Sequence, residues 1–402
     1  MTAGTAERIV RLDDLRVGEL LAEGGEGRVF ELPTRPHLVF KAYRKPPSRR
    51  LLDDLVAWPD EISRPDLAAR VQAAASWPEA VVVDGARHGA ELSVSGVLIT
   101  RAPRRFAVRH RDGTTRLASL SYLTADPAYR AVAYGIALPD PVGPERLGLV
   151  YALARLLEAC ELASPSVGHG DLSTKNVLWS LARGPEVFVI DCDNCERFSD
   201  DGRPLTPAGR RRPMTPNWDD PAVTHGSNPG MESDRYSLAL IFLRVVGAAN
   251  FPIQARQRQG GAVRVDFAVP AHLSGEALLR PGAPVWDLCQ RGLSIADPTG
   301  RPPASAWVAV LEAVLDSLGA ASTMRSVWVA QGGGQPSPAS PLPASVPAGD
   351  VVIRPVRAVR RATARWTMVA SDPHVPAGPV WQRAQSPPPP PAASTWAGPG
   401  VP

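Results

Sequence analysis

The sequence predicts an α+β protein in which a strand-rich N-terminal part is followed by a mainly helical part. Short apolar runs broken by glycines, such as residues 17–21 and 96–99, fill the chain up to about residue 103. Residues 145–162 carry leucine and valine at helical spacing and begin the helical part. From residue 320 the composition shifts to proline, alanine and glycine. We therefore expect a lead-in over 1–12, a structured part up to residue 319, and a disordered tail over 320–402.

The composition argues against a membrane or nucleic-acid partner. Lysine and arginine number 44 against 40 acidic residues, and a net charge of +4 is too small to favour either surface. The longest apolar run, residues 238–251, is too short for a membrane span and is interrupted by Arg244. Residues 1–11 lack the apolar core of a signal peptide, and 4 cysteines make no disulfide framework in 402 residues. We expect a cytoplasmic protein with neither specific nucleic acid binding nor a membrane anchor.

A glycine cluster separates two of the predicted strands. Gly24, Gly25 and Gly27 lie in the run Ala-Glu-Gly-Gly-Glu-Gly-Arg-Val-Phe, residues 22–30. Because glycine has no Cβ, such residues let backbone N–H groups approach a phosphate chain closely. They are also typical of an ordinary hairpin turn, so the cluster alone leaves both interpretations open.

The next apolar strand contains a lysine. Lys41 lies within His-Leu-Val-Phe-Lys-Ala-Tyr, residues 37–43. Burying its ammonium costs free energy unless an anion receives it. The alternative is a lysine on an edge strand that extends to solvent. The residues that follow decide which interpretation we prefer.

The chemistry of the chain is concentrated between residues 169 and 193. His-Gly-Asp-Leu-Ser-Thr-Lys-Asn, residues 169–176, precedes two apolar strands joined by Ala-Arg-Gly-Pro, and Asp191 follows the second strand. A hairpin brings the residues before its first strand beside those after its second, which gathers Asp171, Asn176 and Asp191, with Lys175 nearby. Two carboxylates and an amide oxygen suit Mg²⁺, and one carboxylate remains to orient or deprotonate a hydroxyl. The pattern predicts phosphoryl transfer.

These motifs, in this order, resemble those of the protein kinase superfamily over about residues 13–318. The central match is His169-Gly170-Asp171 with Asn176 after it and Asp191 beyond the hairpin. The glycine cluster matches the kinase pattern in part, since Ala22 stands where the first glycine belongs. Lys41 takes the place of the kinase strand lysine, which favours a phosphate as its partner.

The resemblance implies a two-lobed kinase fold, with a small β-rich N-lobe over 13–103 and a larger, mainly helical C-lobe over 104–319. It implies ATP and Mg²⁺ as cofactors and a divergent bacterial serine/threonine protein kinase. Such an enzyme transfers the γ-phosphate of ATP to a hydroxyl group of a protein substrate. The implied site residues are Gly24, Gly25, Gly27, Val29 and Lys41 for ATP, Asn176 and Asp191 for Mg²⁺, and Asp171 and Lys175 for catalysis.

The chain departs from the family pattern at several positions. The kinase lysine usually pairs with a glutamate on the following helix, and here the partner is open between Asp54 and Glu61. Ala222 stands where a glutamate usually pairs with Arg301, so Glu232 or Asp219 is expected to substitute. Two more departures lie in the central stretch, where Gly170 replaces an arginine and Asp193 replaces a glycine.

Two rival functions use the same residues. Small-molecule kinases on this fold also carry His-Gly-Asp, but residues 215–222 and Arg301 resemble the peptide-docking part that they generally lack. A nucleotide-binding pseudokinase scaffold is the second rival, and the presence of the core site residues argues against it. The arginines of the proline-rich tail allow an acidic partner, although a solvated linker is the default interpretation.

Overall fold

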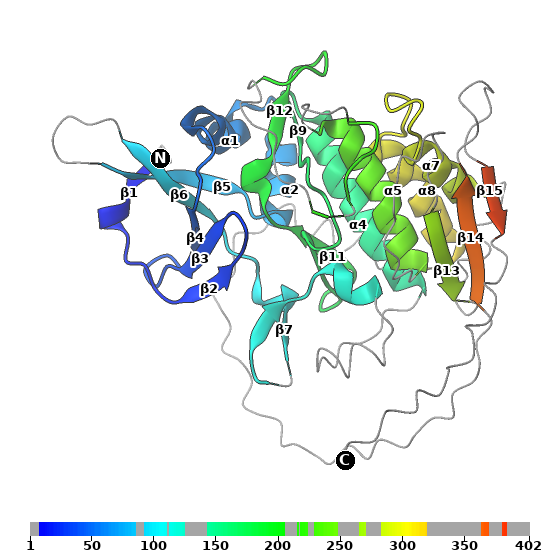
Figure 1. The fold of residues 1–402 in the computed structure, drawn as a ribbon, viewed down its shortest axis with the longest axis horizontal. Helices are drawn as coiled ribbons and strands as arrows, with labels where there is room; N and C mark the ends of the chain where they lie inside the picture. Colours follow the sequence, from blue (N-terminus) through cyan, green and yellow to red (C-terminus); the bar gives the residue numbers. More distant parts are fainter. Residues whose placement is uncertain are drawn as a thin grey trace, which may run out of the picture.

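The structure, a computed structural model of the 402-residue chain, describes residues 8–85, 92–110, 112–124, 143–205, 215–216, 218–223, 229–247, 265–270, 283–319, 363–369 and 380–383. It is a mixed α+β protein with a six-stranded N-terminal sheet and several helices after it, as the sequence predicts. In Figure 1 the sheet lies on one side of the molecule and the helices of the later part lie on the other. No described helix is long and apolar enough to cross a bilayer.

The N-terminal sheet is built from short strands that are rich in apolar residues. Its strands are β1 (Ile9–Arg11), β2 (Leu20–Glu23), β3 (Gly27–Glu31), β4 (Leu38–Tyr43), β5 (Pro78–Asp84) and β6 (Ser93–Thr100). Their order across the sheet is β1-β5-β6-β4-β3-β2. Phe40 packs with Val82 and Leu98 on one face of the sheet. Because side chains alternate along a strand, Lys41 and Tyr43 project from the other face of β4.

Residues 9–11 belong to this sheet, so the lead-in predicted over residues 1–12 is wrong at its C-terminal end. β1 runs parallel to β5, with Val10 opposite Val82. Val10 is 3% exposed and packs in the same apolar layer as Phe40. Three residues are too few for their alternation to be recognised in a sequence, which explains the error. Residues 1–7 lie outside the described part of the chain.

The helices follow the apolar periodicity of the sequence. They are α1 (Arg49–Glu61), α2 (Pro65–Ala74), α4 (Gly143–Leu162), α5 (Met231–Gly247), α7 (Pro284–Gly292) and α8 (Ala304–Ser317). Ser48 caps α1, because its Oγ accepts a hydrogen bond of 3.3 Å from the Leu51 N–H. The helix predicted over 145–162 is α4, which packs against α5 and α8 (Figure 1).

The main apolar core extends across the boundary predicted at residue 103. Leu55 and Trp58 of α1 belong to the same buried cluster as α4, α5 and α8. The indole of Trp58 packs on Trp77 with ring centroids 4.7 Å apart, and its N–H donates to the Pro165 carbonyl at 2.7 Å. On its other side α1 covers the sheet through Leu52. α1 is therefore held between the sheet and the helices rather than by the sheet alone.

The described part of the chain after the sheet also contains three pairs of short strands. β9 (Ser166–Gly168) pairs with β12 (Glu196–Phe198), and β10 (Val177–Ser180) pairs with β11 (Glu186–Val189). β7 (Ala107–Arg109) and β8 (Thr115–Leu117) form a further hairpin. After β8 the chain makes a 3₁₀ turn at Leu120–Thr124. Residues 125–142 lie outside the described chain.

The tail predicted to be disordered over residues 320–402 contains two strands. β14 (Thr363–Val369) pairs with β13 (Val265–Pro270) and with β15 (Val380–Arg383), and all pairs are antiparallel. The prediction of disorder is wrong for these two segments, because it averaged composition over the whole tail. The run Thr-Ala-Arg-Trp-Thr-Met-Val is rich in residues that favour strands. The remainder of residues 320–402 lies outside the described part.

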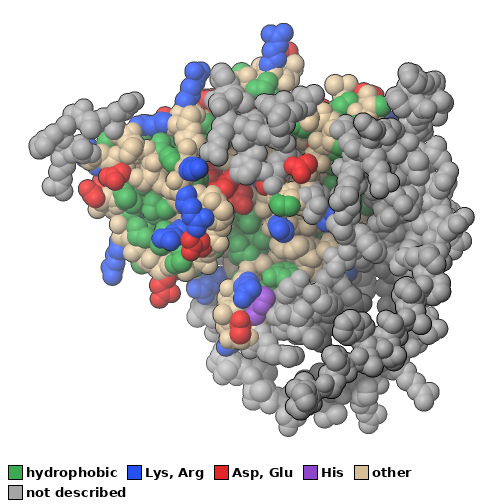
Figure 2. Space-filling view, viewed as in Figure 1, with side chains coloured by type: hydrophobic (Ala, Val, Ile, Leu, Met, Phe, Trp, Pro, Cys, Tyr) green, Lys and Arg blue, Asp and Glu red, His purple; other side chains and the backbone are tan. Residues whose placement is uncertain are grey.

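The visible face of the molecule carries charges of both signs. Figure 2 shows lysine and arginine side chains interspersed with aspartate and glutamate, and an apolar area over the N-terminal sheet. Leu20 and Leu21 of β2 are 50% and 45% exposed and contribute to the apolar surface of the sheet. On the described residues of this face, the basic side chains do not form one continuous surface.

A buried ion pair fixes the segment before α5 to the end of the helical part. Arg301 is 1% exposed and forms a bidentate pair with Asp220, through Nη1 at 2.5 Å and Nη2 at 2.9 Å. The expected partners Glu232 and Asp219 are both wrong. Asp219 is exposed, and Glu232 contributes only its backbone carbonyl, at 2.8 Å from Nη1. Neighbouring residues of an irregular segment face different sides, and spacing alone does not tell which one faces inward.

We predict that Asp220→Ala lowers the free energy of unfolding by about 3–5 kcal/mol, because it leaves the Arg301 guanidinium buried without a counter-charge. Urea denaturation followed by circular dichroism would measure this change. The matched control is Asp219→Ala, which removes an exposed neighbour and should change stability by less than about 0.5 kcal/mol. Equal effects of the two substitutions would contradict the assignment of Asp220 as the partner.

Candidate functional site

The hairpin of β10 and β11 gathers the polar residues as the sequence predicts. Val177 at the start of β10 pairs with Val189 at the end of β11. Beyond that pair, the Ile190 N–H donates to the Asn176 carbonyl at 2.9 Å. The loop before β10 and the residues after β11 therefore lie side by side, which places Asp171, Asn176 and Asp191 at one end of the hairpin.

Asp171 receives hydrogen bonds from two segments of the chain. Asn176 Nδ2 donates to its Oδ2 at 3.2 Å and to its carbonyl at 2.8 Å. Thr215 donates its backbone N–H to Oδ1 at 2.7 Å and its hydroxyl to Oδ2 at 3.1 Å. Burial raises the pKa of Asp171 above the usual value for aspartate, although the bonds from Thr215 act in the opposite direction. A carboxylate that accepts a hydrogen bond from a hydroxyl group has the geometry of a general base, and a raised pKa makes it a better proton acceptor.

Lys41 lies at the centre of the site and contacts three carboxylates. Its Nζ is 2.9 Å from Asp193 Oδ1, 3.1 Å from Glu26 Oε2 and 3.2 Å from Asp191 Oδ1. The lysine is 4% exposed, so the alternative of an edge-strand lysine that reaches solvent is wrong. Burial opposes the charged ammonium, but the carboxylates, Asp193 foremost, raise the pKa of Lys41 well above its usual value. The ammonium is therefore protonated at any physiological pH.

Neither of the expected helix partners of Lys41 contacts it. Both residues instead contact Arg197 of β12. The Arg197 guanidinium donates to the Glu61 carboxylate and, at 3.0 Å, to the main-chain carbonyl of Asp54. Arg197 is 7% exposed, so it needs acceptors on the side of α1 that faces it. The partner that the sequence interpretation missed is Asp193, two residues after Asp191. The signal that the sequence offered was the acidic residue at position 193.

Lys175 does not join the contacts at Asp171. Its side chain is exposed, and the structure gives its ammonium no partner among the described residues. Only its backbone N–H is engaged, with Ser173 Oγ at 3.3 Å. The catalytic role of Lys175 therefore stays a prediction.

The glycine cluster forms the turn of the hairpin between β2 and β3. Its ends are joined by the Gly24 N–H, which donates to the Gly27 carbonyl at 2.9 Å. A Cβ on Gly27 would lie 2.1 Å from the Ala42 carbonyl oxygen, so this glycine is required for β3 to pair with β4. A Cβ on Gly24 or Gly25 would meet no atom within 4 Å. These two glycines face open space, which suits either a plain turn or the approach of a ligand.

Val29, the remaining predicted ATP contact, lies on β3 beside Lys41. The two residues are opposite each other in the ladder between β3 and β4. Val29 is partly buried and packs against Val39, Val97 and Ile99 on the face of the sheet that carries Lys41. It is therefore on the correct side of the sheet to contact a ligand held at Lys41.

Asp234 anchors the loop that contains His169 and Gly170. At the start of α5, its two carboxylate oxygens accept the N–H groups of His169 at 2.6 Å and Gly170 at 3.0 Å. Gly170 adopts a left-handed φ of 74°, which explains a glycine at this position. His169 in turn connects to the Ile190 carbonyl through Nε2 at 2.9 Å, so its role is to brace the loop.

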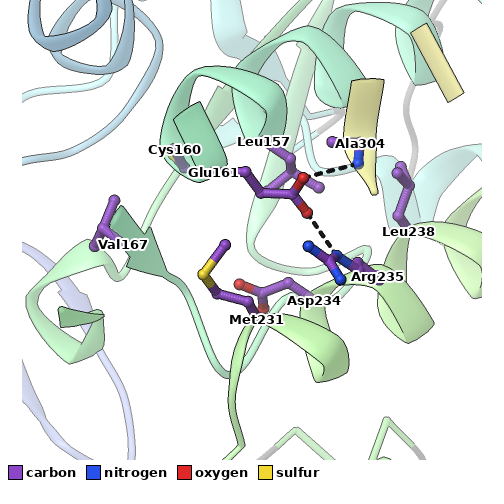
Figure 3. Close-up of a pocket in the computed structure, with 9 residues that line it drawn as sticks. All are labelled: Leu157, Cys160, Glu161, Val167, Met231, Asp234, Arg235, Leu238 and Ala304. Atoms are coloured by element: carbon purple, nitrogen blue, oxygen red, sulfur yellow. Dashed lines mark hydrogen bonds and ion pairs between the residues drawn. The ribbon is translucent and has the colours of Figure 1, made fainter. Parts of the chain in front are cut away.

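Behind Asp234 is a small cavity of about 10 Å³ between α4 and α5. Figure 3 shows Glu161 beside it, bonded to Arg235 at 2.8 Å and to the Ala304 N–H at 3.0 Å. Burial raises the pKa of Asp234 to about 6, and the Glu161 carboxylate is a smaller cause in the same direction. The cavity is too small for a substrate, and neither Lys41 nor Asp171 lines it.

The residues predicted for Mg²⁺ could supply only a few of the ligands that the ion needs. No group of three or more His, Cys, Asp or Glu side chains suited to a metal occurs in the described ranges. Asn176 uses its amide N–H groups on Asp171, which leaves its oxygen for other contacts. Asp191 is 43% exposed and contacts Lys41 through Oδ1. One carboxylate and one amide oxygen agree with Mg²⁺ bound mainly by phosphate and water.

The comparisons with known proteins leave the family open. No model of a known protein family matches the chain, and no curated protein is significantly similar to it.

We predict that the buried Asp234 makes stability depend on pH. Its pKa is about 6 in the folded protein against 3.8 for ordinary aspartate, so the folded state binds the proton more tightly. Its stabilising contribution is therefore complete below pH 4 and is lost as the pH rises through 6. The difference in unfolding free energy, wild type minus Asp234→Asn, should fall by up to about 3 kcal/mol between pH 4 and pH 7. Denaturation across this range checks it, and a constant difference would contradict it.

Proposed function

We propose that this chain is an ATP- and Mg²⁺-dependent phosphotransferase with the two-lobed arrangement of the protein kinase superfamily, acting on serine or threonine hydroxyls of a protein. The observation that carries the proposal is the contact between Lys41 and Asp191. The two residues are 150 positions apart in the sequence, and Lys41 Nζ lies 3.2 Å from Asp191 Oδ1. A phosphate-binding cation and a metal-binding carboxylate have to meet in this way around one nucleotide.

The binding role follows from charge and position. Lys41 would hold the α- and β-phosphates, beneath the turn that contains Gly24, Gly25 and Gly27, with Val29 beside it. Asn176 and Asp191 would hold Mg²⁺, which neutralises charge on the phosphates and orients them. A charge-assisted contact such as that of Lys41 contributes about 1.5–3 kcal/mol.

The catalytic role belongs to Asp171. Its carboxylate would orient the acceptor hydroxyl and accept its proton as the oxygen attacks the γ-phosphorus and the bond to the β-phosphate oxygen breaks. Lys175, whose side chain is exposed four residues after Asp171, would supply a cation near the transferred group. Positioning and charge neutralisation are the main contributions that such a reaction needs from a protein.

The contact of Thr215 favours a protein substrate over a small molecule. Thr215 belongs to the segment before α5 and donates its hydroxyl to Asp171 at 3.1 Å. The same segment is anchored to the helical part by Asp220 and Arg301. A polypeptide hydroxyl thus reaches the proposed base from a segment that a small-molecule kinase does not need.

We predict that Lys41→Met and Asp191→Ala each reduce the transfer of labelled phosphate from ATP at least about a hundredfold, because each removes a contact to the phosphates or their metal. The assay would use radiolabelled ATP and Mg²⁺ with general protein substrates, and it would also record labelling of the protein itself. Lys45→Met, which removes an exposed lysine just beyond β4, is the matched control and should keep full activity.

Three outcomes would count against parts of this proposal. Full activity of either variant would contradict the site assignment. Phosphate transfer to small hydroxyl compounds with no label in any protein would favour a small-molecule kinase. Equal, minimal transfer by the wild type and Asp171→Asn, with ATP still bound by both, would favour a pseudokinase scaffold.

We also predict that activity falls at acidic pH through Asp171. Because burial raises its pKa above 3.8, kcat/KM should decrease as the pH falls, with a midpoint above that value. Rates with a peptide substrate from pH 4 to pH 8 measure it. If the decrease arose from Asp234 instead, it would disappear in the Asp234→Asn variant.

A further inference from the structure

The three carboxylates around Lys41 differ in how firmly they are held. The Asp193 side chain is fully buried, whereas the Glu26 and Asp191 side chains are 33% and 43% exposed. An exposed carboxylate can exchange its cation for water and counter-ions at little cost, and a buried one cannot. Burial therefore separates a permanent partner of Lys41 from partners that a ligand can replace.

Asp193 has the properties of the permanent partner. Its Oδ1 accepts from Lys41 at 2.9 Å, and its Oδ2 accepts from the Tyr43 hydroxyl at 2.6 Å. Lys41 and Tyr43 lie on the same face of β4, so one carboxylate fixes two side chains of that strand. Burial, with Asp193 beside it, raises the pKa of Tyr43 well above its usual value, so the hydroxyl remains a donor.

α1 does not provide an anchor for Lys41. Its Glu61 side chain and its Asp54 carbonyl accept from Arg197, and Asp53 pairs with Arg49 at 3.3 Å within the helix. α1 is also fixed in the main core through Trp58. Lys41 is therefore positioned from the loop after β11 and not from the helix.

Glu26 occupies a different position. It lies in the turn between Gly25 and Gly27, and its Oε2 accepts both from Lys41 at 3.1 Å and from Asn194 Nδ2 at 2.8 Å. The turn borders open space at Gly24 and Gly25. Glu26 therefore places an anionic oxygen against the Lys41 ammonium. It does so from the turn beneath which we expect a phosphate to bind.

We propose that Asp193 is the fixed positioning residue of Lys41, whereas Glu26 is a placeholder that the phosphate chain of ATP displaces from the lysine. The inference rests on the proposed function, since ATP is the ligand. When a phosphate oxygen replaces Glu26 Oε2 on Lys41, an anionic oxygen still faces the ammonium, and Glu26 retains Asn194 as a donor.

The test is a pair of substitutions with effects of opposite sign on ATP affinity. Glu26→Gln removes the competing charge and should lower the Kd for ATP about three- to tenfold. Asp193→Asn should raise that Kd about tenfold or more and reduce kcat, because Lys41 loses its fixed position. Isothermal titration calorimetry on the full chain measures both Kd values, and radiolabelled phosphate transfer measures kcat.

Matched controls keep the test specific. Glu23→Gln removes a carboxylate of the same hairpin that pairs with Arg28 and Arg44, and it should leave the Kd unchanged. Tyr43→Phe removes only the hydroxyl on Asp193 and should raise the Kd severalfold, so the anchor is tested even if Asp193→Asn does not fold. Titrations with and without Mg²⁺ exclude a metal-ligand role, because an anchor of Lys41 changes the affinity for metal-free ATP as well.

The outcomes separate the inference from the proposed function. A wild-type protein that binds no ATP overturns both. A wild type that binds ATP and transfers phosphate, with unchanged affinity in Glu26→Gln, overturns the placeholder alone. Unchanged affinity for metal-free ATP in Tyr43→Phe and in a folded Asp193→Asn overturns the anchor.

Discussion

The ion cluster at Lys41 joins the N-terminal sheet to the loop after β11, and the geometry of the site depends on it. Asp193 is fully buried and uses both oxygens on β4, at 2.9 Å to Lys41 and 2.6 Å to Tyr43. A buried ion pair contributes little net stability, since desolvation offsets most of the attraction. Its effect is on position: the ammonium of a sheet residue is held within reach of Asp191, which comes from a distant part of the chain.

Two arginines hold neighbouring segments in position through ion pairs in the same way. Arg301 pairs with Asp220 and holds the segment that delivers Thr215 to Asp171. Arg197 links β12 to α1 through the Glu61 carboxylate. Each guanidinium is nearly buried and joins segments far apart in the sequence. Removing one partner would leave a charge without compensation, so each contact permits only one arrangement of its two segments.

The sequence predicted the elements that local residue patterns determine. It did not predict contacts that depend on how distant segments pack together. The hairpin of β10 and β11 and the helix α4 follow from turn residues and periodicity, and the hairpin alone brings Asp171, Asn176 and Asp191 together. The partner of Lys41 was missed because spacing cannot show that Arg197 takes the carboxylate and carbonyl offered by α1. Asp220 was missed because it lies beside the equally acidic Asp219 in an irregular segment. The strands β14 and β15 were missed because their residues are few within a long proline-rich tail.

The buried Asp234 shows why such costly charges occur at the site. The loop at His169 and Gly170 has no regular structure, so its backbone N–H groups need an acceptor from elsewhere. Asp234 supplies both oxygens from the start of α5, where the helix dipole favours a negative charge. Its raised pKa reflects the free energy that this burial costs at neutral pH. A neutral residue would cost less, but it could not accept two N–H groups as strongly, and the loop that carries Asp171 would lose its attachment to the helical core.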